Sequence, residues 1–311
     1  MAIGEYLTHE KFFEDKPADL VEVEENPIDE MWHDQPEWPD TPLVIHEEEF
    51  TGRSVHTNVS EVMEEVTKEG GEALMVTALD EVAWMTNLRG ADIPFNPLFF
   101  SYALVHQVDE SWRIRLYMNM DKTAHIGEYL LASRIDVFPY EQIFEDISPD
   151  GLFGQTKIVV DDNFLNTKSY RTMNQDNVIF APDIMGNIKM VKNSTMIGHW
   201  RQCQIKDGAA LVKFFAWLRH ELLVKGSKIT EYEGTLKLTE FRAMGEHYMG
   251  DSFGTILSTG ANGAIVHYKP DPEHSEILNP DEMILCDSGG HYKDGTTDTT
   301  RTLHFKQPSD E

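Results

Sequence analysis

The sequence has few cysteines, few basic residues and no long apolar run. Its 311 residues include only two cysteines, Cys203 and Cys286, and neither has a partner at zinc-ligand spacing. Two cysteines are too few for a disulfide framework, so we expect buried free thiols in a reducing compartment. No apolar segment approaches the roughly 20 residues that a membrane-spanning helix requires. The N-terminus also lacks the basic and apolar regions of a signal peptide, which predicts a cytoplasmic location.

The shortage of basic residues leaves a strongly acidic chain. Lys and Arg number 26 against 54 Asp and Glu, a formal net charge of −28. Such a surface repels phosphate backbones and anionic lipid headgroups, so nucleic acid and membranes are not expected as partners. Residues 1–50 alone hold sixteen acidic side chains and two lysines, together with five prolines. This composition predicts an acidic, extended and poorly packed lead-in over residues 1–42.

Helix-like and strand-like stretches alternate from about residue 54 onward. Gly70 and Gly71 end the first of the helical stretches. The expected helices lie at 55–69, 80–87 and 125–133, and the expected strands at 72–78, 102–108, 113–119 and 157–160. Alternation of this kind predicts an α/β domain, which we place at residues 43–193.

The pattern changes near residue 194, where two long helical stretches precede a set of short strands. Ser194 or Thr195 can cap the first helix, which Gly226 ends. Thr230 and Glu233 form a capping box for a second helix that reaches Tyr248. The expected strands lie at 253–258, 263–268, 283–288 and 297–303. Helices followed by strands predict an α+β domain over residues 194–311.

Two carboxylates in the last strand pair, Asp287 and Asp298, are the strongest candidates for chemistry. Asp287 follows an apolar run and so lies at the end of a buried strand, and Asp298 lies in a threonine-rich strand. Two carboxylates brought together inside a sheet repel each other unless a cation binds both or one stays protonated. Ligation by oxygen alone favours hard divalent ions such as Mn²⁺ or Mg²⁺.

The spacing of these two residues does not by itself establish a metal site. A two-residue turn at Asp294-Gly295 would place Asp298 opposite His291. Asp287 would then lie four residues away on the same face, roughly 13 Å at the rise of a strand. A longer turn or a bulge would be needed to bring the carboxylates together. Two interpretations therefore remain open. Either both residues are metal ligands, or one is a turn Asp and the other a solvent-facing strand Asp.

The motifs add a family resemblance. The segment 287–302, DSGGHYKDGTTDTTRT, resembles the metal-binding hairpin of the Xaa-Pro aminopeptidases (aminopeptidase P), within the creatinase and methionine aminopeptidase "pita-bread" superfamily. The segment 258–268, STGANGAIVHY, resembles a second signature, and residues 76–84 and 87–97 resemble the middle domain of the three-domain cytosolic form. The resemblance covers residues 72–305, about three-quarters of the chain.

The resemblance implies roles for three residues, and the strand phase suggests a role for a fourth. Asp287 and Asp298 would bind a dinuclear centre of two divalent ions, with Mn²⁺ the expected metal. His267 would contact bound peptide near the scissile bond, whereas a lone histidine in this position would otherwise be structural. Thr300 is in phase with Asp298 and could hydrogen-bond a ligand carboxylate, although an ordinary strand threonine is an equal alternative.

The implied fold is a creatinase-like α/β middle domain followed by the first half of a pita-bread domain. The implied activity is hydrolysis of the N-terminal bond of peptides with proline in the second position. Family members complete the site with one His and two Glu downstream of the hairpin. We therefore expect a C-terminally truncated chain with no complete catalytic set, inactive alone. The alternative is a non-catalytic peptide- or protein-binding fragment that dimerises with a full-length enzyme, and since the family often forms dimers, a homodimer is also an expectation.

Overall fold

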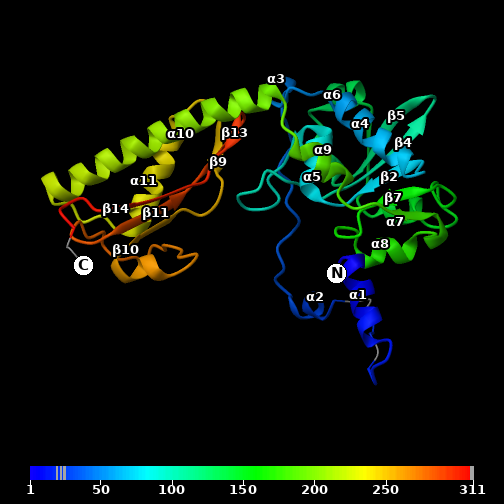
Figure 1. Cartoon of the computed structure of the whole chain (residues 1–311), viewed down its shortest axis with the longest axis horizontal. Coiled ribbons are helices and arrows are strands. Elements are labelled where there is room, and N and C mark those ends of the chain that lie inside the picture. The colour runs from blue at the N-terminus through cyan, green and yellow to red at the C-terminus, as the bar shows by residue number, and fades with distance from the viewer. Residues whose placement is uncertain (19, 22, 24–25, 309–311) are drawn as a thin grey trace. The chain divides into compact units, whose positions relative to one another are not determined.

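The computed structural model describes residues 1–308 apart from residues 19, 22, 24 and 25. The chain forms two compact units (Figure 1). The first consists of Met1–Glu48 and Arg53–Val191, and the second of Glu49–Gly52 and Lys192–Glu311. The segment Glu49–Gly52 is therefore part of the second unit, and Asn193 Nδ2 donates a hydrogen bond to the carbonyl oxygen of Thr51 at 2.8 Å.

A six-stranded sheet forms the centre of the first unit, with the order β6-β5-β4-β2-β7-β8. The pairs β2–β4 and β4–β5 are antiparallel, whereas β5–β6, β2–β7 and β7–β8 are parallel. The predicted neighbouring strands at 102–108 and 113–119 are thus confirmed as the hairpin β4–β5. The strands are β2 (Ala73–Val76), β4 (Tyr102–Val108), β5 (Ser111–Tyr117), β6 (Ile135–Phe138), β7 (Ile158–Val160) and β8 (Val178–Phe180).

Helices cover both faces of this sheet, because alternate strand residues enter two separate apolar clusters. Leu74 and Val105 pack in one cluster, while Met75 and Leu104 pack in the other. The mixed sheet with helices on both faces confirms the predicted α/β class. The helices are α4 (Val55–Lys68), α5 (Leu79–Thr86), α6 (Gly127–Ala132), α7 (Gln142–Asp146), α8 (Thr167–Thr172) and α9 (Ile184–Met190). Two short strands, β1 (Val44–Ile45) and β3 (Leu88–Arg89), pair beside it.

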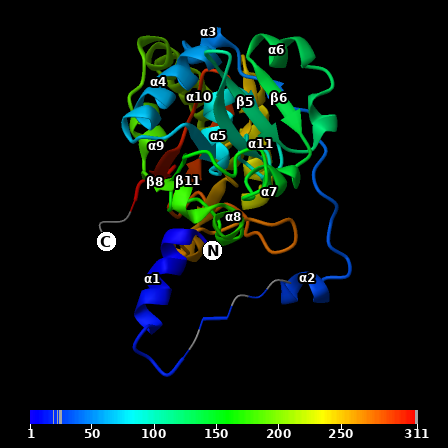
Figure 2. The same cartoon turned by 90° about the vertical axis from the view of Figure 1, so that its right-hand side faces the viewer.

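The expectation of an extended lead-in over residues 1–42 is wrong for two segments. Residues Ile3–Phe13 form helix α1, which begins beside α8 (Figure 2), and Pro27–Met31 form the short helix α2. Ile3 is fully buried, and its amide donates to the carbonyl oxygen of Leu165 at 2.7 Å. One apolar anchor therefore fixes the start of an acidic segment. Four acidic residues of the lead-in, at 19, 22, 24 and 25, lie outside the described part of the chain.

The described residues 192–308 of the second unit form two long helices, a few short helical turns and two small sheets. Helix α10 (Ser194–His220) is capped by Asn193, whose side chain accepts from the amide of Met196, rather than by Ser194 or Thr195. The helix continues through the π-helical turn η3 (Glu221–Lys225) and ends at Gly226, which has a φ of 66°. The capping box of Thr230 and Glu233 is confirmed at the start of α11 (Glu231–Ala243).

Helix α11 ends five residues earlier than predicted because the chain then enters a strand. Tyr248–Asp251 form β9, which pairs with β12 (Gly290–Tyr292), and β12 pairs in turn with β13 (Gly295–Thr296). The second sheet has the order β10-β11-β14, all antiparallel. Its strands are β10 (Ile256–Thr259), β11 (Ile284–Ser288) and β14 (Thr299–Leu303).

Strand β11 has one face in the core and one face partly open. Ile284 and Cys286 pack with Leu218 of α10 and Leu238 of α11, while Asp287, on the opposite face, is partly exposed. The strand expected at 263–268 is wrong, since Gly260–Ala264 form the 3-10 turn η4 and a turn follows it. Both cysteines are free and buried, and burial raises the pKa of Cys203 to about 12 and of Cys286 to about 11.

Candidate metal centre

Asp287 and Asp298 lie closer to each other along the strand pair than a turn at Asp294-Gly295 would place them. The β12–β13 hairpin pairs His291 with Thr296 and Tyr292 with Gly295, so its two-residue loop is Lys293-Asp294. The same register continues into β11–β14, where Asp287 lies opposite Thr300. The two-residue turn at Asp294-Gly295, which would place Asp298 opposite His291, is therefore not formed. The expectation that a longer turn or a bulge closes the gap is wrong, because a two-residue loop one position earlier does so.

The register error has a physical cause at Asp294. Its carboxylate is buried and forms an ion pair with Lys206 of α10, with 2.8 Å between Nζ and Oδ1. This contact fixes Asp294 as the last residue of the loop instead of the first. The two-residue shift places Asp298 as a diagonal neighbour of Asp287, at a Cα separation of roughly 7–8 Å in an antiparallel pair. Side chains at such positions lie on one face and can bind one cation.

Asp287 also has an unsatisfied oxygen. Its Oδ1 atom is buried and has no hydrogen-bond partner. A buried carboxylate oxygen without a donor is costly, and a cation bound there removes that cost. Asp298, by contrast, is exposed. Carboxylate oxygens are the donors that hard divalent cations prefer, so metal binding by Asp287 and Asp298 stays a prediction.

The described residues do not provide a full ligand set. Across residues 1–308, apart from the four undescribed positions in the lead-in, no group of three or more His, Cys, Asp or Glu could hold a metal. The centre that these residues form is therefore a pair of carboxylates on one strand pair.

Thr300 faces Asp287 directly across the β11–β14 pair. Residues opposite each other in an antiparallel pair direct their side chains to the same face, so the Thr300 hydroxyl lies beside the Asp287 carboxylate. Thr300 is exposed, and its carbonyl oxygen accepts a hydrogen bond from Arg301 at 2.7 Å. The role of Thr300 at a ligand carboxylate stays a prediction.

A buried polar network lies on the core side of the same strand, and the sequence analysis missed it. Arg242 Nε donates to Asp207 at 2.7 Å, and Arg242 Nη2 donates to the Ser288 hydroxyl at 3.0 Å. The Tyr292 hydroxyl donates to Asp207 at 3.0 Å. Arg242 and Asp207 are almost completely buried. The network connects both helices to the residue after Asp287, and a charged residue inside each amphipathic helix was its only sequence signal.

His267 lies in the turn that follows η4, where it is exposed and has a left-handed backbone with a φ of 58°. The loop leaves β10 at Thr259, opposite Ile284, which is three residues along β11 from Asp287. None of the hydrogen bonds or ion pairs within the described chain joins His267 to Asp287 or Asp298. A substrate contact by His267 therefore stays a prediction.

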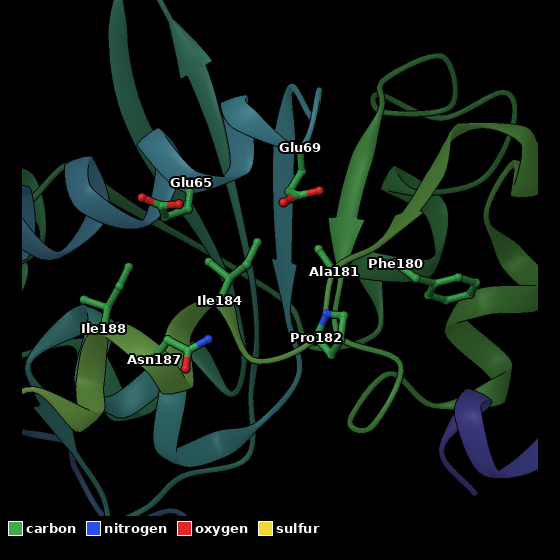
Figure 3. Close-up of a pocket in the computed structure, with 8 residues that line it drawn as sticks. All are labelled: Glu65, Glu69, Phe180, Ala181, Pro182, Ile184, Asn187 and Ile188. Carbon is green, nitrogen blue, oxygen red and sulfur yellow. The ribbon is translucent and has the colours of Figure 1, made fainter.

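The first unit contains a separate pocket of about 500 Å³ (Figure 3). Glu65 and Glu69 of α4 lie on one side, and Ile184, Asn187 and Ile188 of α9 lie on another. Phe180, Ala181 and Pro182 complete the lining. No predicted site residue belongs to it, because all four lie in the second unit.

Comparison with known proteins gives the family. Residues 34–195 match the Creatinase/Prolidase N-terminal domain, and residues 198–311 match metallopeptidase family M24. The chain therefore belongs to the family of proteins that carry the creatinase/prolidase N-terminal domain, followed here by an M24 segment.

Individual relatives agree with this assignment. A protein of Arthroderma gypseum named "Probable Xaa-Pro aminopeptidase P" is 38% identical over 300 residues, covering 94% of this chain and 46% of its own length. The protein of the same name from Colletotrichum graminicola is 39% identical over 324 residues, covering 99% of this chain and 51% of its own. The chain thus spans about half the length of the curated relatives it matches.

Solved structures show the same fold. The X-prolyl aminopeptidase of Caenorhabditis elegans, described as a cytosolic enzyme with a di-nuclear active site, superimposes with a TM-score of 0.91 at 28% identity and covers 99% of this chain and 50% of its own. An Xaa-Pro dipeptidase from Bacillus anthracis has a TM-score of 0.63 at 16% identity, covers 83% of this chain and 67% of its own, and supports the fold alone. No helix in the described part of the chain is long and apolar enough to cross a membrane.

Proposed function

We propose that residues 1–311 are part of a metal-dependent aminopeptidase that hydrolyses the N-terminal Xaa-Pro bond of peptides. The observation that carries this proposal is the unsatisfied, buried Oδ1 of Asp287 on the face it shares with Asp298. The names of the relatives that align with nearly the whole chain support the reaction and the substrate class. The cytosolic X-prolyl aminopeptidase of C. elegans supports a cytoplasmic location.

Asp287 and Asp298 would hold the metal, and the proposed ions are two Mn²⁺. Such a centre lowers the pKa of a bound water and polarises the peptide carbonyl. Thr300 would orient the Asp287 carboxylate by a hydrogen bond across the strand pair. His267 would bind the substrate peptide beside the scissile bond. Arg242 and Asp207 would have a structural role, because their network holds the strand that carries Asp287.

Residues 1–311 by themselves are proposed to be inactive. Two carboxylates neutralise at most one divalent ion, and the described chain contains no third ligand near them. The same observation favours a second candidate function, in which this polypeptide binds peptides or a second protein copy without catalysis. A homodimer, or a dimer with a longer enzyme, belongs to that candidate.

A metal titration of the purified chain tests the proposal. Mn²⁺ should broaden the NMR signals of residues around Asp287 selectively, and Asp287→Asn or Asp298→Asn should each remove the broadening. The matched control is Asp281→Asn, because Asp281 is exposed and pairs with Lys306. Broadening that persists in both site variants would contradict the assignment. Release of the first residue from an Xaa-Pro peptide, lost in Asp298→Ala, would falsify the proposed inactivity of the chain alone.

A further inference from the structure

One buried carboxylate of the second unit, that of Glu231, has no part in the proposed metal site and, among the described residues, no cation beside it. Glu231, the first residue of α11, has no exposed surface. None of the ion pairs within the described chain includes it. Its carboxylate accepts hydrogen bonds from the Thr259 amide at 2.8 Å, Asn262 Nδ2 at 3.1 Å, the Tyr268 hydroxyl at 2.6 Å and the Glu276 amide at 3.1 Å.

All four donors come from one segment, residues 259–276. A buried carboxylate without a cation is tolerated only when donors satisfy its oxygens, and here neutral groups do so. The amide of Glu231 also donates to the Glu276 carbonyl at 2.9 Å, which closes the segment onto the start of α11. Burial, and then the hydrogen bond to Glu231, raise the pKa of Tyr268 to about 12, so its hydroxyl remains a donor at neutral pH.

These bonds hold the loop that carries His267. Asn262 lies five residues before His267, and Tyr268 directly after it. His267 itself is exposed, as are Ile265 and Val266 before it. Because these three side chains have little packing of their own, the path of the loop depends on the anchors on either side.

We propose that Glu231 is a positioning residue, which acts through Tyr268 and Asn262 to place His267 for the substrate. The proposal rests on the proposed function, since that function gives His267 its contact with peptide. Glu231 touches neither substrate nor metal in this arrangement. It fixes the one loop of the second unit that carries a predicted substrate contact.

The test uses three variants of the whole 311-residue chain. In Glu231→Gln one oxygen becomes an amide NH₂, which faces donors instead of accepting from them. In Tyr268→Phe only the hydroxyl that donates to Glu231 is lost. The matched control is Glu233→Ala, which removes the side chain that closes the capping box in the same helical turn but has no bond to the loop.

Two measurements separate positioning from stability. Amide exchange of residues 262–268 should accelerate about tenfold or more in Glu231→Gln, since hydrogen bonds to a charged group are lost. The imidazole ¹H–¹³C signal of His267, assigned with His267→Gln, should shift or broaden in Glu231→Gln and in Tyr268→Phe. In Glu233→Ala both measurements should match the parent chain, although its melting temperature falls.

The outcomes are distinct. A Glu231→Gln chain with a lower melting temperature but an unchanged loop and His267 signal would overturn the proposal, and so would a Tyr268→Phe chain with an unchanged His267 signal. Neither measurement needs metal or turnover, so each tests the anchor apart from the proposed function. An Xaa-Pro peptide that leaves the His267 signal of the parent chain unmoved would count against the substrate role of His267 itself.

Discussion

Asp287 and Thr300 lie directly opposite each other on β11 and β14, with Asp298 two residues before Thr300 on the same face. Asp298 lies in the two-residue break between β13 and β14, and the register is the same on both sides of that break. The strand pair thereby presents three oxygen-bearing side chains on the face opposite the core. The register of a single hairpin loop, Lys293-Asp294, determines that they share this face.

Thr300→Val tests the hydroxyl, because the substitution keeps the shape of the side chain and removes only its hydrogen bond. We expect the Mn²⁺ affinity to fall by about tenfold, the lower end of the range for a residue that supports a metal ligand. Thr302→Val is the matched control, because Thr302 lies on the same strand as Thr300 but opposite Leu285 instead of Asp287. Equal Mn²⁺ dissociation constants for the two variants, measured by NMR titration, would show that Thr300 is an ordinary strand residue.

Gly289 lies opposite Asp298 in this register, and its surroundings leave no room for a side chain. A Cβ atom there would lie 2.0 Å from the carbonyl oxygen of Thr297 and 2.2 Å from the hydroxyl of Ser252. Gly289→Ala must therefore displace the backbone next to Asp298. We expect a loss of about 1–3 kcal/mol in the free energy of unfolding, together with weaker Mn²⁺ binding.

The control for Gly289→Ala is Gly208→Ala in α10, where no atom lies within 4 Å of the added Cβ. That variant should gain about 0.5–1 kcal/mol, because alanine favours a helix interior over glycine. Urea unfolding and the Mn²⁺ titration give both quantities. Unchanged metal binding in Gly289→Ala would show that the hairpin tolerates the displacement.

The parts of the fold that depend on local sequence could be predicted, whereas those that depend on distant contacts could not. The capping box of Thr230 and Glu233 needs only neighbouring residues, and it was predicted correctly. Asp294-Gly295 has the local composition of a two-residue turn. Lys206, 88 positions earlier, instead holds Asp294 as the last residue of the loop Lys293-Asp294. Local rules have no access to such an ion pair, and the error moved the register of Asp298 by two residues.

The loop around His267 shows the same limit. Ile265 and Val266 are apolar and predicted a strand, but both are exposed in a turn that Glu231 anchors. The role expected for Asp287 and Asp298 came from motif resemblance rather than spacing. What the structure adds is the shared face and the unsatisfied oxygen of Asp287.

The buried ion pair of Arg242 and Asp207 predicts a large stability effect. Arg242→Met leaves Asp207 buried with a hydroxyl donor but no cation, so we expect a loss of about 3–5 kcal/mol in the free energy of unfolding. The double variant Arg242→Met/Asp207→Leu should lose less, because no unpaired charge remains. Lys237→Met, which removes an exposed pair with Glu240, is the control and should cost less than about 1 kcal/mol. A double variant as unstable as Arg242→Met would contradict this account.

Glu81 in the first unit predicts a pH dependence of stability. Its side chain is buried, and burial together with Asp80 raises its pKa from 4.5 to about 7, with smaller contributions of the same sign from Asp161 and Asp183. The folded chain therefore binds this proton more tightly than the unfolded chain. The stabilisation is complete below pH 4.5 and is lost as the pH rises toward 7.

Glu81→Gln should remove this dependence, because the amide is neutral at every pH. We expect the variant to be more stable than the parent chain at pH 8 and to show a flatter stability profile between pH 5 and 7. Asp80→Asn is the matched comparison: it removes the nearest like charge, so the transition assigned to Glu81 should move to lower pH. Urea unfolding at a series of pH values measures both effects. A parent profile and a Glu81→Gln profile that run parallel across this range would place the proton on another group.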